Sequence, residues 1–282
     1  MPPNFNKILK MNKKIIKWNE WFAGFIDGDG CILVGSKKQP NLISIEATTS
    51  LEDEGILSDI KKRFGGSLKI VAGKKCIRWR TAKLKVIIDI IHTINGNIRH
   101  NIRKEQLRKA CSLLNIPYQE PNEIRFDNSY FAGFFDADGT ISITVNKSPK
   151  EYNNIPGILG QVKRLIFSRG ENLCVISLSQ KDLQNIEIFT KILNLGKIYI
   201  RKRLTKTNTT KYHWYLNLKE IPEFVYYLQK NPIKSKKKKR RFHLLKDYIE
   251  LKKMGAHLAS HDSIQFKEWK KFCYKWYNLD YK

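Results

Sequence analysis

The chain has 282 residues, of which 53 are lysine or arginine and 26 are aspartate or glutamate, giving a formal charge of +27. Together with a hydrophobic content of 41%, this charge predicts a folded protein with a polyanionic partner, and it favours a nucleic acid over a membrane surface. We expect neither a membrane span nor export, because no apolar run approaches the roughly 20 residues that cross a bilayer and no secretory signal opens the sequence.

The first half of the sequence predicts a helix, two strands, a helix, a hairpin and two more helices. The first helix covers Trp18–Asp27 and ends at the glycines of the segment GDG, because glycine destabilises helix interiors. Strict alternation of apolar and polar residues predicts the strands, and a longer period predicts the helices. In chain order the later elements are residues 31–38, 41–49, 51–64, 67–81 with a turn near 72–74, 83–94 and 102–114.

The second half repeats this order. A helix is predicted over 127–139, with Asp127, Asn128 or Ser129 as its cap. The elements that follow are residues 139–146, 173–180, 182–194, 197–203, 211–218 and 220–229. Trp79 and Trp214 occupy equivalent places, each between polar neighbours that point the other way.

Three segments stand outside the repeat. Residues 115–128 carry two prolines and no periodicity, which predicts a linker. Residues 147–172 lengthen the loop between the first two strands of the second half, as either a DNA-contacting finger or a surface excursion. The tail after Met254 has no first-half counterpart, and its aromatic residues at helical spacing predict a helix packed on the C-terminal half.

Two copies of one unusual string are the most informative feature of the chain. FAGFIDGDG at 22–30 and FAGFFDADG at 131–139 lie 109 residues apart, which is about the size of one small domain. Small residues at helical spacing in both copies predict that two helices pack closely against each other. Their ends would then place Asp29 and Asp138 side by side, and two neighbouring carboxylates favour a divalent cation between them.

The strings resemble the signature of the LAGLIDADG family, and two copies in one chain resemble its single-chain homing endonucleases. The resemblance implies an α+β fold of two pseudo-symmetric LAGLIDADG domains, each a curved antiparallel four-stranded sheet backed by helices, forming a DNA-binding saddle. We expect domains at 1–116 and 128–282, joined by a linker at 117–127.

The function that this resemblance implies is site-specific DNA cleavage by a monomer. The protein would hydrolyse one phosphodiester per strand of double-stranded DNA at a long, non-palindromic site, leave short 3′ overhangs and promote the mobility of its intron. Hard oxygen ligands suit Mg²⁺ or Mn²⁺, and Ca²⁺ would bind without supporting cleavage. By resemblance, the metal ligands are Asp29 and Asp138 with the carbonyls of Gly28 and Ala137, and Asp27 and Asp136 are structural.

The resemblance also implies a water-organising residue and a basic residue in each half. Gln180 fits the first role in the second half, and the first-half counterpart falls near Thr49, which departs from the family pattern. Lys237, in the basic run at 231–241, fits the second role. In the first half we expect Arg99, with Arg103 as the reserve.

Base reading is expected from the polar faces of the sheets. Base-edge donors and phosphate partners are frequent at the outward positions of the strands, which favours DNA over a merely solvated face. The expected DNA-binding residues are Lys37, Gln39, Ser44, Glu46, Lys69, Arg78, Arg80, Ser142, Thr144, Asn146, Ser148, Tyr199, Arg201, His213 and Tyr215.

Two other functions remain open on this scaffold. An RNA maturase, which binds intron RNA and assists group I intron splicing, would share the fold and the basic surface. A DNA-binding regulator usually adds a helix-turn-helix domain, for which the sequence leaves no room. A bias toward Lys, Asn and Ile fits an organellar gene, and five scattered cysteines fit reduced thiols inside a cell.

Overall fold

The structure is a computed structural model that describes residues 3–35, 40–202 and 210–281. Its contacts divide the chain into two compact units. The first contains Met1–Thr140 and Ser177–Lys236, and the second contains Ile141–Ile176 and Lys237–Lys282. Both motif strings lie wholly in the first unit.

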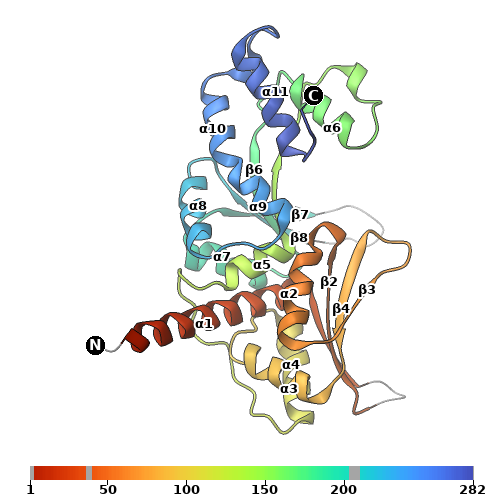
Figure 1. The fold of residues 1–282 in the computed structure, drawn as a ribbon, viewed down its shortest axis with the longest axis vertical. Coiled ribbons are helices and arrows are strands. Elements are labelled where there is room, and N and C mark those ends of the chain that lie inside the picture. The colour runs from red at the N-terminus through yellow and green to blue at the C-terminus, as the bar shows by residue number, and fades with distance from the viewer. Residues whose placement is uncertain (1–2, 36–39, 203–209, 282) are drawn as a thin grey trace. The chain divides into compact units, whose positions relative to one another are not determined.

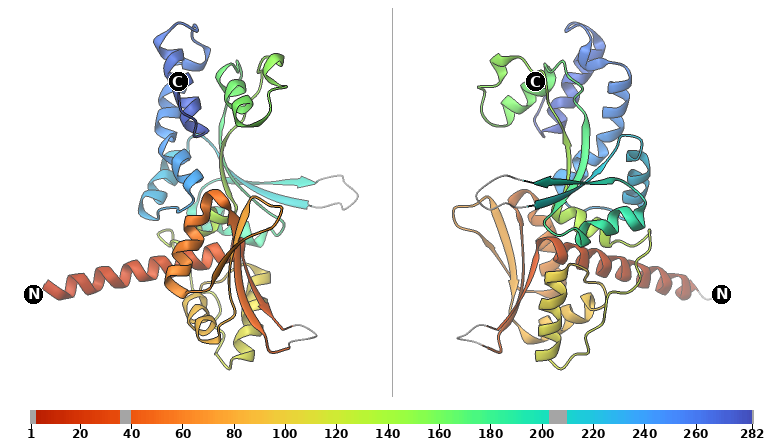
Figure 2. Two further views of the ribbon diagram at one scale, coloured as in Figure 1. Left: turned by 45° about the vertical axis from the view of Figure 1, so that its right-hand side comes forward. Right: turned by 180° about the vertical axis from the view of Figure 1, so that it is seen from behind.

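A four-stranded antiparallel sheet with the strand order β1-β2-β4-β3 dominates the first half. Its inward residues alternate as predicted, and Trp79 is fully buried between the exposed Arg78 and Arg80. Helices cover one face of the sheet and leave the other bare, as Figure 2 shows. The elements are β1 (Gly30–Val34), β2 (Ile43–Ser50), α2 (Glu54–Phe64), β3 (Ser67–Ile70), β4 (Cys76–Thr81), α3 (Leu84–Ile94) and α4 (Asn101–Leu113).

The second half has a sheet of the same order, β5-β6-β8-β7, so the predicted fold class is confirmed. Trp214 takes the place of Trp79: each indole is buried and donates to a backbone carbonyl before the hairpin, Leu195 O at 2.7 Å and Gly65 O at 2.8 Å. The elements are β5 (Gly139–Ile143), β6 (Cys174–Gln180), α7 (Gln184–Leu193), β7 (Lys197–Lys202), β8 (Thr210–Leu216) and α8 (Ile221–Lys230). The expected last residue of β7, at 203, lies outside the described residues.

The two motif helices, α1 (Pro3–Asp29) and α5 (Tyr130–Asp138), pack side by side in the first unit (Figure 1). Helix α1 is longer than predicted at both ends and continues through Gly28 to Asp29. A helical glycine costs only about 1 kcal/mol, and the packing of α1 on α5 outweighs that cost. The strand β1 then begins at once, at Gly30.

The second unit contains the insertion, parts of β5 and β6, and the chain from Lys237 onward. The insertion forms α6 (Gly157–Ile166). The basic run forms α9 (Lys236–His243), and α10 (Leu245–Lys253) and α11 (Ile264–Trp276) follow it. The tail helix α11 packs on α6, and Trp269 donates its indole N–H to Ile166 O at 3.3 Å. The expected helical tail is thus present, and its partner is the insertion of the second half.

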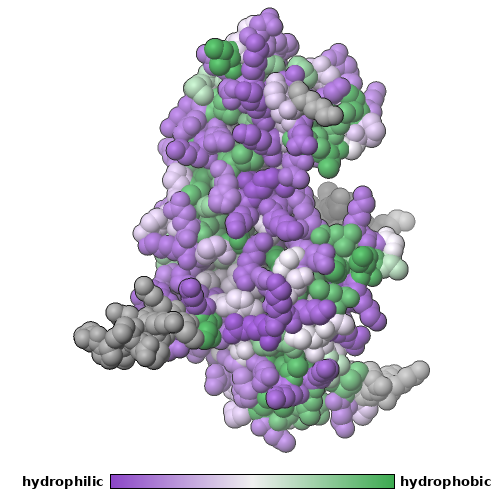
Figure 3. Space-filling view, viewed as in Figure 1, coloured by the Kyte–Doolittle hydropathy of each residue, from purple (hydrophilic) through white to green (hydrophobic). Residues whose placement is uncertain are grey.

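Other expectations also have an outcome in the described residues. All five cysteines are free thiols. In the described parts of the chain, no helix has the length and apolar character needed to cross a membrane. The face seen in Figure 3 is largely hydrophilic, with separate apolar patches, in line with the high charge of the chain.

Candidate metal and nucleic-acid site

The motif helices approach each other through reciprocal glycines. A Cβ at Gly24 would overlap Tyr130 O and lie 2.8 Å from Phe134 N. A Cβ at Gly133, which is the equivalent residue of the second motif, would overlap Trp21 O. The backbones therefore touch where each helix lacks a side chain, as the small-residue pattern predicted.

The buried carboxylate of Asp27 ties α1 to the start of α4 and to the other motif helix. Its Oδ2 accepts the backbone N–H of Arg99 at 2.6 Å and of His100 at 3.0 Å. The same oxygen accepts the hydroxyl of Tyr130, on α5, at 2.6 Å. Burial is the main reason why the pKa of Asp27 is raised to about 6, and the hydrogen bonds from Tyr130 and the backbone lower it in part.

Asp136 repeats this arrangement in the opposite direction. It accepts the backbone N–H of Lys234 at 2.7 Å and of Ser235 at 3.0 Å, just before α9. It also accepts the indole N–H of Trp21, on α1, at 2.8 Å. Trp21 and Tyr130 are equivalent residues of the two repeats, so each helix donates a side-chain hydrogen bond to the buried aspartate of the other. These contacts support the expected structural role of Asp27 and Asp136.

The second aspartate of each motif stands at the end of its helix, where the helices still touch. A Cβ at Gly28 would overlap the Cβ of Ala137 and lie 3.2 Å from Asp138 Oδ2. Asp29 and Asp138 directly follow these residues, and both are half-buried. Gln180, at the end of β6, donates from Nε2 to Asp138 Oδ2 at 2.7 Å, so the structure brings this expected residue to the motif carboxylate.

The chemistry of this donor set fits a hard divalent cation. Mg²⁺ binds to one or two carboxylates and keeps several waters, which leaves coordination positions for phosphate oxygens. Two half-buried carboxylates at abutting helix ends satisfy that requirement. No group of three or more acidic, histidine or cysteine side chains poised for a metal occurs among the described residues, so a closed protein-only cage is not available there.

The basic residues expected near the metal occupy different surroundings. The Arg99 guanidinium donates to Asn122 O in the linker at 2.8 Å and lies 5.4 Å from the ring centre of Tyr130. The reserve residue Arg103 donates to Gln106 Oε1 at 3.2 Å. Lys237 is exposed near the start of α9, in the second unit.

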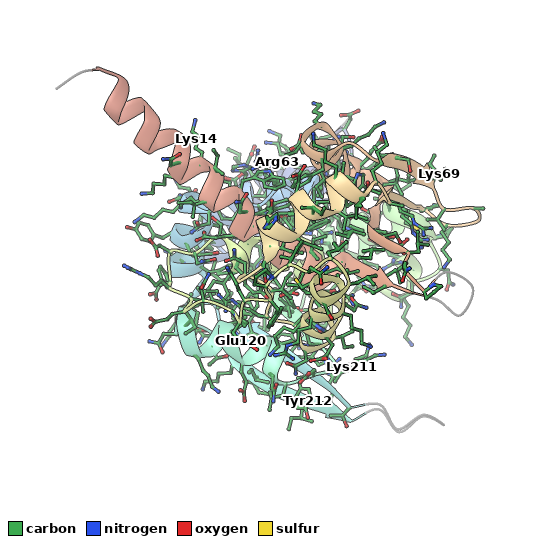
Figure 4. All side chains as sticks on the ribbon, turned by 90° about the horizontal axis from the view of Figure 1, so that it is seen from below. Lys14, Arg63, Lys69, Glu120, Lys211 and Tyr212 are labelled. Atoms are coloured by element: carbon green, nitrogen blue, oxygen red, sulfur yellow. The ribbon has the colours of Figure 1, made fainter. Side chains whose placement is uncertain are left out.

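The bare face of the first sheet presents an ordered pair of arginines. Arg78 and Arg80 flank Glu46 on the neighbouring strand, with N–O separations of 3.7 Å and 4.0 Å. Arg78 also donates to Thr48 Oγ1 at 3.1 Å, and Arg80 to Ser44 Oγ at 3.1 Å. Lys69, labelled in Figure 4, is exposed and pairs in register with Arg78. Ser44, expected to meet DNA, is buried and holds Arg80 instead.

The second sheet presents aromatic rings beside basic residues. His213 and Tyr215 stack with ring centres 5.8 Å apart, and Tyr199 packs edge-on against Tyr215. Arg201 pairs in register with Lys211, which Figure 4 labels on β8. Burial and the charges of Arg201 and Lys211 lower the pKa of His213, which favours its neutral form.

Further residues expected to contact DNA lie on β5 and beyond it. Ser142 is on β5, where it alternates with buried isoleucines as predicted. Strand β5 ends at Ile143, so Thr144, Asn146 and Ser148 follow the strand. There the loop closes on itself: Thr144 bonds to Leu173 O, and Asn146 O accepts the Ser168 hydroxyl. Lys37 and Gln39 lie outside the described residues.

Sequence reasoning missed the partners of the buried aspartates and the role of Glu46. The first could have been found, because Trp21 and Tyr130 lie at the same 109-residue spacing as the motifs. The ion pairs of Glu46 depend on strand register, which the sequence alone did not set.

A chain with two such motif helices and two sheets of this order is a double-motif LAGLIDADG protein. It belongs to the LAGLIDADG endonuclease family, whose model matches residues 22–110 and 131–249. It is 37% identical over 95% of its length to the "Probable intron-encoded endonuclease aI2" of Debaryomyces hansenii. It is also 36% identical over 93% of its length to the "Intron-encoded RNA maturase bI4" of Saccharomyces cerevisiae.

The chain spans 39% and 37% of the lengths of these two relatives. The "Intron-encoded DNA endonuclease ai2a" of Dictyostelium discoideum is 28% identical over 93% of the chain and 75% of the relative. Among solved structures, the meganuclease I-SmaMI bound to uncleavable DNA has a TM-score of 0.61 and 17% identity, covering 90% of this chain and 97% of that one. I-AabMI bound to uncleaved DNA has a TM-score of 0.59, 17% identity, and coverage of 90% and 98%. These two likenesses support the fold.

Proposed function

We propose that this chain is a divalent-metal-dependent DNA endonuclease that cuts both strands of a long, non-palindromic site, leaves short 3′ overhangs and promotes the mobility of its intron. The observation that supports this most is the pair of half-buried aspartates, Asp29 and Asp138, at helix ends that abut through Gly28 and Ala137. We also propose that the chain consists of two repeat domains, at 1–116 and 128–282, joined by a linker at 117–127. In this proposal the protein acts as a monomer and is located in an organelle.

In the reaction, the oxygen of water bonds to phosphorus while the bond to the 3′ oxygen breaks. One proton of water goes to that oxygen and the other to solvent, which leaves a 3′ hydroxyl and a 5′ phosphate. Bound Mg²⁺ or Mn²⁺ would activate water and neutralise charge at the phosphate, and Ca²⁺ would hold the DNA uncut. Asp29 and Asp138 would hold the ion, with the carbonyls of Gly28 and Ala137 as further ligands, and Gln180 orients Asp138 by donating to its Oδ2.

DNA would lie on the bare faces of the two sheets. Arg78 and Arg80 carry donors suited to guanine, and their ion pairs with Glu46 hold them extended before DNA arrives. On the second sheet, the stacked ring of His213 and the charge of Arg201 offer base-edge and phosphate contacts. Because the exposed faces of the two sheets carry different side chains, the two halves of the DNA site are expected to differ in sequence.

A maturase function is the second candidate, favoured by the identity of 36% to a protein named as an RNA maturase. The second unit, which includes the insertion and the tail, offers additional surface for intron RNA. Such a protein would keep the motif aspartates for structure alone.

One experiment separates the two candidates. The protein is incubated with a randomised duplex DNA library and Mg²⁺, and cut molecules are selected and sequenced. The proposal expects one enriched site, cut with 3′ overhangs, and no cutting in a chelator. A protein that cuts no duplex but accelerates the splicing of a group I intron RNA would be a maturase, and the endonuclease proposal would be wrong.

The first-sheet arginines give a prediction about readout. Replacing Arg78 or Arg80 with Ala should relax preference at a few adjacent base pairs in one half-site, costing about 1–3 kcal/mol for each lost bidentate contact. The check is the cleavage profile over all single-base variants of the selected site. Lys62→Ala, which removes an exposed lysine from α2, should leave that profile unchanged. An equal loss for every sequence would instead make the arginines phosphate anchors.

A further inference from the structure

Glu46 is the only acidic residue in the strands that the structure describes. The strands of the first sheet also hold three basic residues, Lys69, Arg78 and Arg80. The strands of the second sheet hold lysines and arginines and no carboxylate among their described residues. A carboxylate on a face that meets DNA repels phosphate, because the two charges have the same sign. Glu46 therefore weakens the attraction of the first sheet for DNA as a whole.

The carboxylate of Glu46 lies close to both guanidinium groups without occupying their donors. Its side chain is 16% exposed, whereas those of Arg78 and Arg80 are 44% and 47% exposed, so DNA on this face would meet the arginines first. The N–O separations of 3.7 Å and 4.0 Å are longer than a hydrogen bond. Glu46 thus offsets the charge of the two arginines and leaves their N–H groups available to DNA.

This offset of charge affects phosphates and bases differently. Attraction to a phosphate depends on net charge, which Glu46 lowers in the cluster that it forms with the two arginines. A guanine edge carries no net charge and is recognised by the direction of two donors. Hydroxyl groups fix that direction here, because Thr48 accepts from Arg78 and Ser44 accepts from Arg80, each at 3.1 Å. The cluster is therefore better suited to base edges than to phosphates.

We propose that Glu46 is a specificity-determining residue that weakens the binding of Arg78 and Arg80 to DNA phosphates and so raises the preference of the first sheet for its target over other sequences. This rests on the proposed endonuclease function, which makes duplex DNA the ligand of the bare face. Glu46 acts through the arginines and contacts no base. The described strands of the second sheet carry no carboxylate, so this effect belongs to one half-site.

The first test measures binding to a random-sequence duplex, in a chelator and over a range of salt concentrations. Glu46→Gln keeps the size of the side chain and removes its charge. It should steepen the slope of log K against log[salt] by about 0.9, the value for one more neutralised phosphate, and tighten binding about fivefold near 0.1 M salt. Glu123→Gln makes the same change of charge at an exposed linker residue and should leave the slope unchanged.

The second test measures discrimination. The same proteins bind a duplex that carries the selected site, and the ratio of its affinity to that of the random-sequence duplex is compared between variants. Glu46→Gln should lower this ratio about fivefold, because the added attraction acts on phosphates in any sequence. Glu46→Asp keeps the charge and should keep most of the native ratio.

A double-mutant cycle tests whether the effect passes through the arginines. In a protein that already carries Arg78→Ala and Arg80→Ala, Glu46 has no guanidinium beside it to offset. Adding Glu46→Gln to that protein should change the salt slope for random-sequence DNA by far less than in the native protein. A change of the same size in both backgrounds would show a general effect of charge and would overturn the inference.

Two further results would overturn it. The first is an unchanged salt slope in Glu46→Gln, or an equal gain in affinity for the two duplexes. The second is a loss of target affinity confined to one base pair in Glu46→Gln and Glu46→Asp alike, because Glu46 would then read a base itself. A protein that selects no site and cuts no duplex would instead count against the endonuclease function, and the slope for random-sequence DNA would still decide the role of Glu46.

Discussion

Asp138→Asn abolishes double-strand cleavage and leaves binding to the target intact: this is the expected result for the second motif, and Asp29→Asn is expected to behave likewise. Asn keeps the size of the side chain but removes the charge that a hard divalent cation requires. Charge stabilisation by the ion is a several-kcal/mol effect and each 1.4 kcal/mol is tenfold, so a loss of about 10³-fold or more is expected.

Binding should be retained or strengthened in these variants, because a negative charge beside the phosphate is removed. Affinity is measured in a chelator, so that the metal does not contribute, and cleavage is measured separately in Mg²⁺. Asp89→Asn, an exposed aspartate on α3, is the matched control and should cut normally. Full cutting by Asp138→Asn would remove that residue from the mechanism.

Gly133→Ala should destabilise the first unit severely. The added Cβ would overlap Trp21 O and lie 2.9 Å from Phe25 N, and backbone atoms cannot move aside as a side chain can. Overpacking of a core usually costs 1–3 kcal/mol, so a loss of about 3 kcal/mol or more is expected here. Gly24→Ala should act in the same way from the opposite helix.

The matched control is Gly55→Ala, in the first turn of α2. Its nearest neighbour would be Lys236 Cε at 3.9 Å, so the change should be neutral or stabilising by up to about 1 kcal/mol through helix propensity. Urea midpoints followed by tryptophan fluorescence compare the variants, and midpoints are preferred because a chain of two units need not unfold in one step. A Gly133→Ala protein with the native midpoint would contradict the close packing of the motif helices.

The sequence predicted the parts of the fold that depend on local pattern. Strand alternation around Trp79, the hairpin near residues 72–74, and the helix of the tail were all recognisable from periodicity. The repeat itself predicted which helices would meet. Small residues at helical spacing allow two helix backbones to approach closely, and this pattern occurs in both motif helices. Helix α1 was predicted too short, since its continuation through Gly28 depends on packing against α5.

The sequence predicted those parts of the candidate site whose chemistry requires a particular side chain, such as the carboxylate of a metal ligand. Asp138 and Gln180 were expected together, and the structure brings their side chains into hydrogen-bond contact. The choice of Arg99 relied on counting along a segment with no motif, and the structure holds its side chain at Asn122. Strand β5 was predicted too long because polar and apolar residues keep alternating after Ile143, although the backbone there turns into the insertion.

The contact between Gly28 and Ala137 also determines which halves can pair. The hydrogen of Gly28 lies against the methyl group of Ala137, and a methyl in its place would overlap it. A second half expressed alone would have to set Ala137 against Ala137 to form the same helix pair, and that overlap would disfavour self-association in this geometry. Two copies of the first half would meet glycine to glycine without a clash. The helix of the first half can therefore pair in this geometry with either half, whereas the helix of the second half is disfavoured from pairing with a copy of itself. This difference directs a newly made second half toward the first half of its own polypeptide.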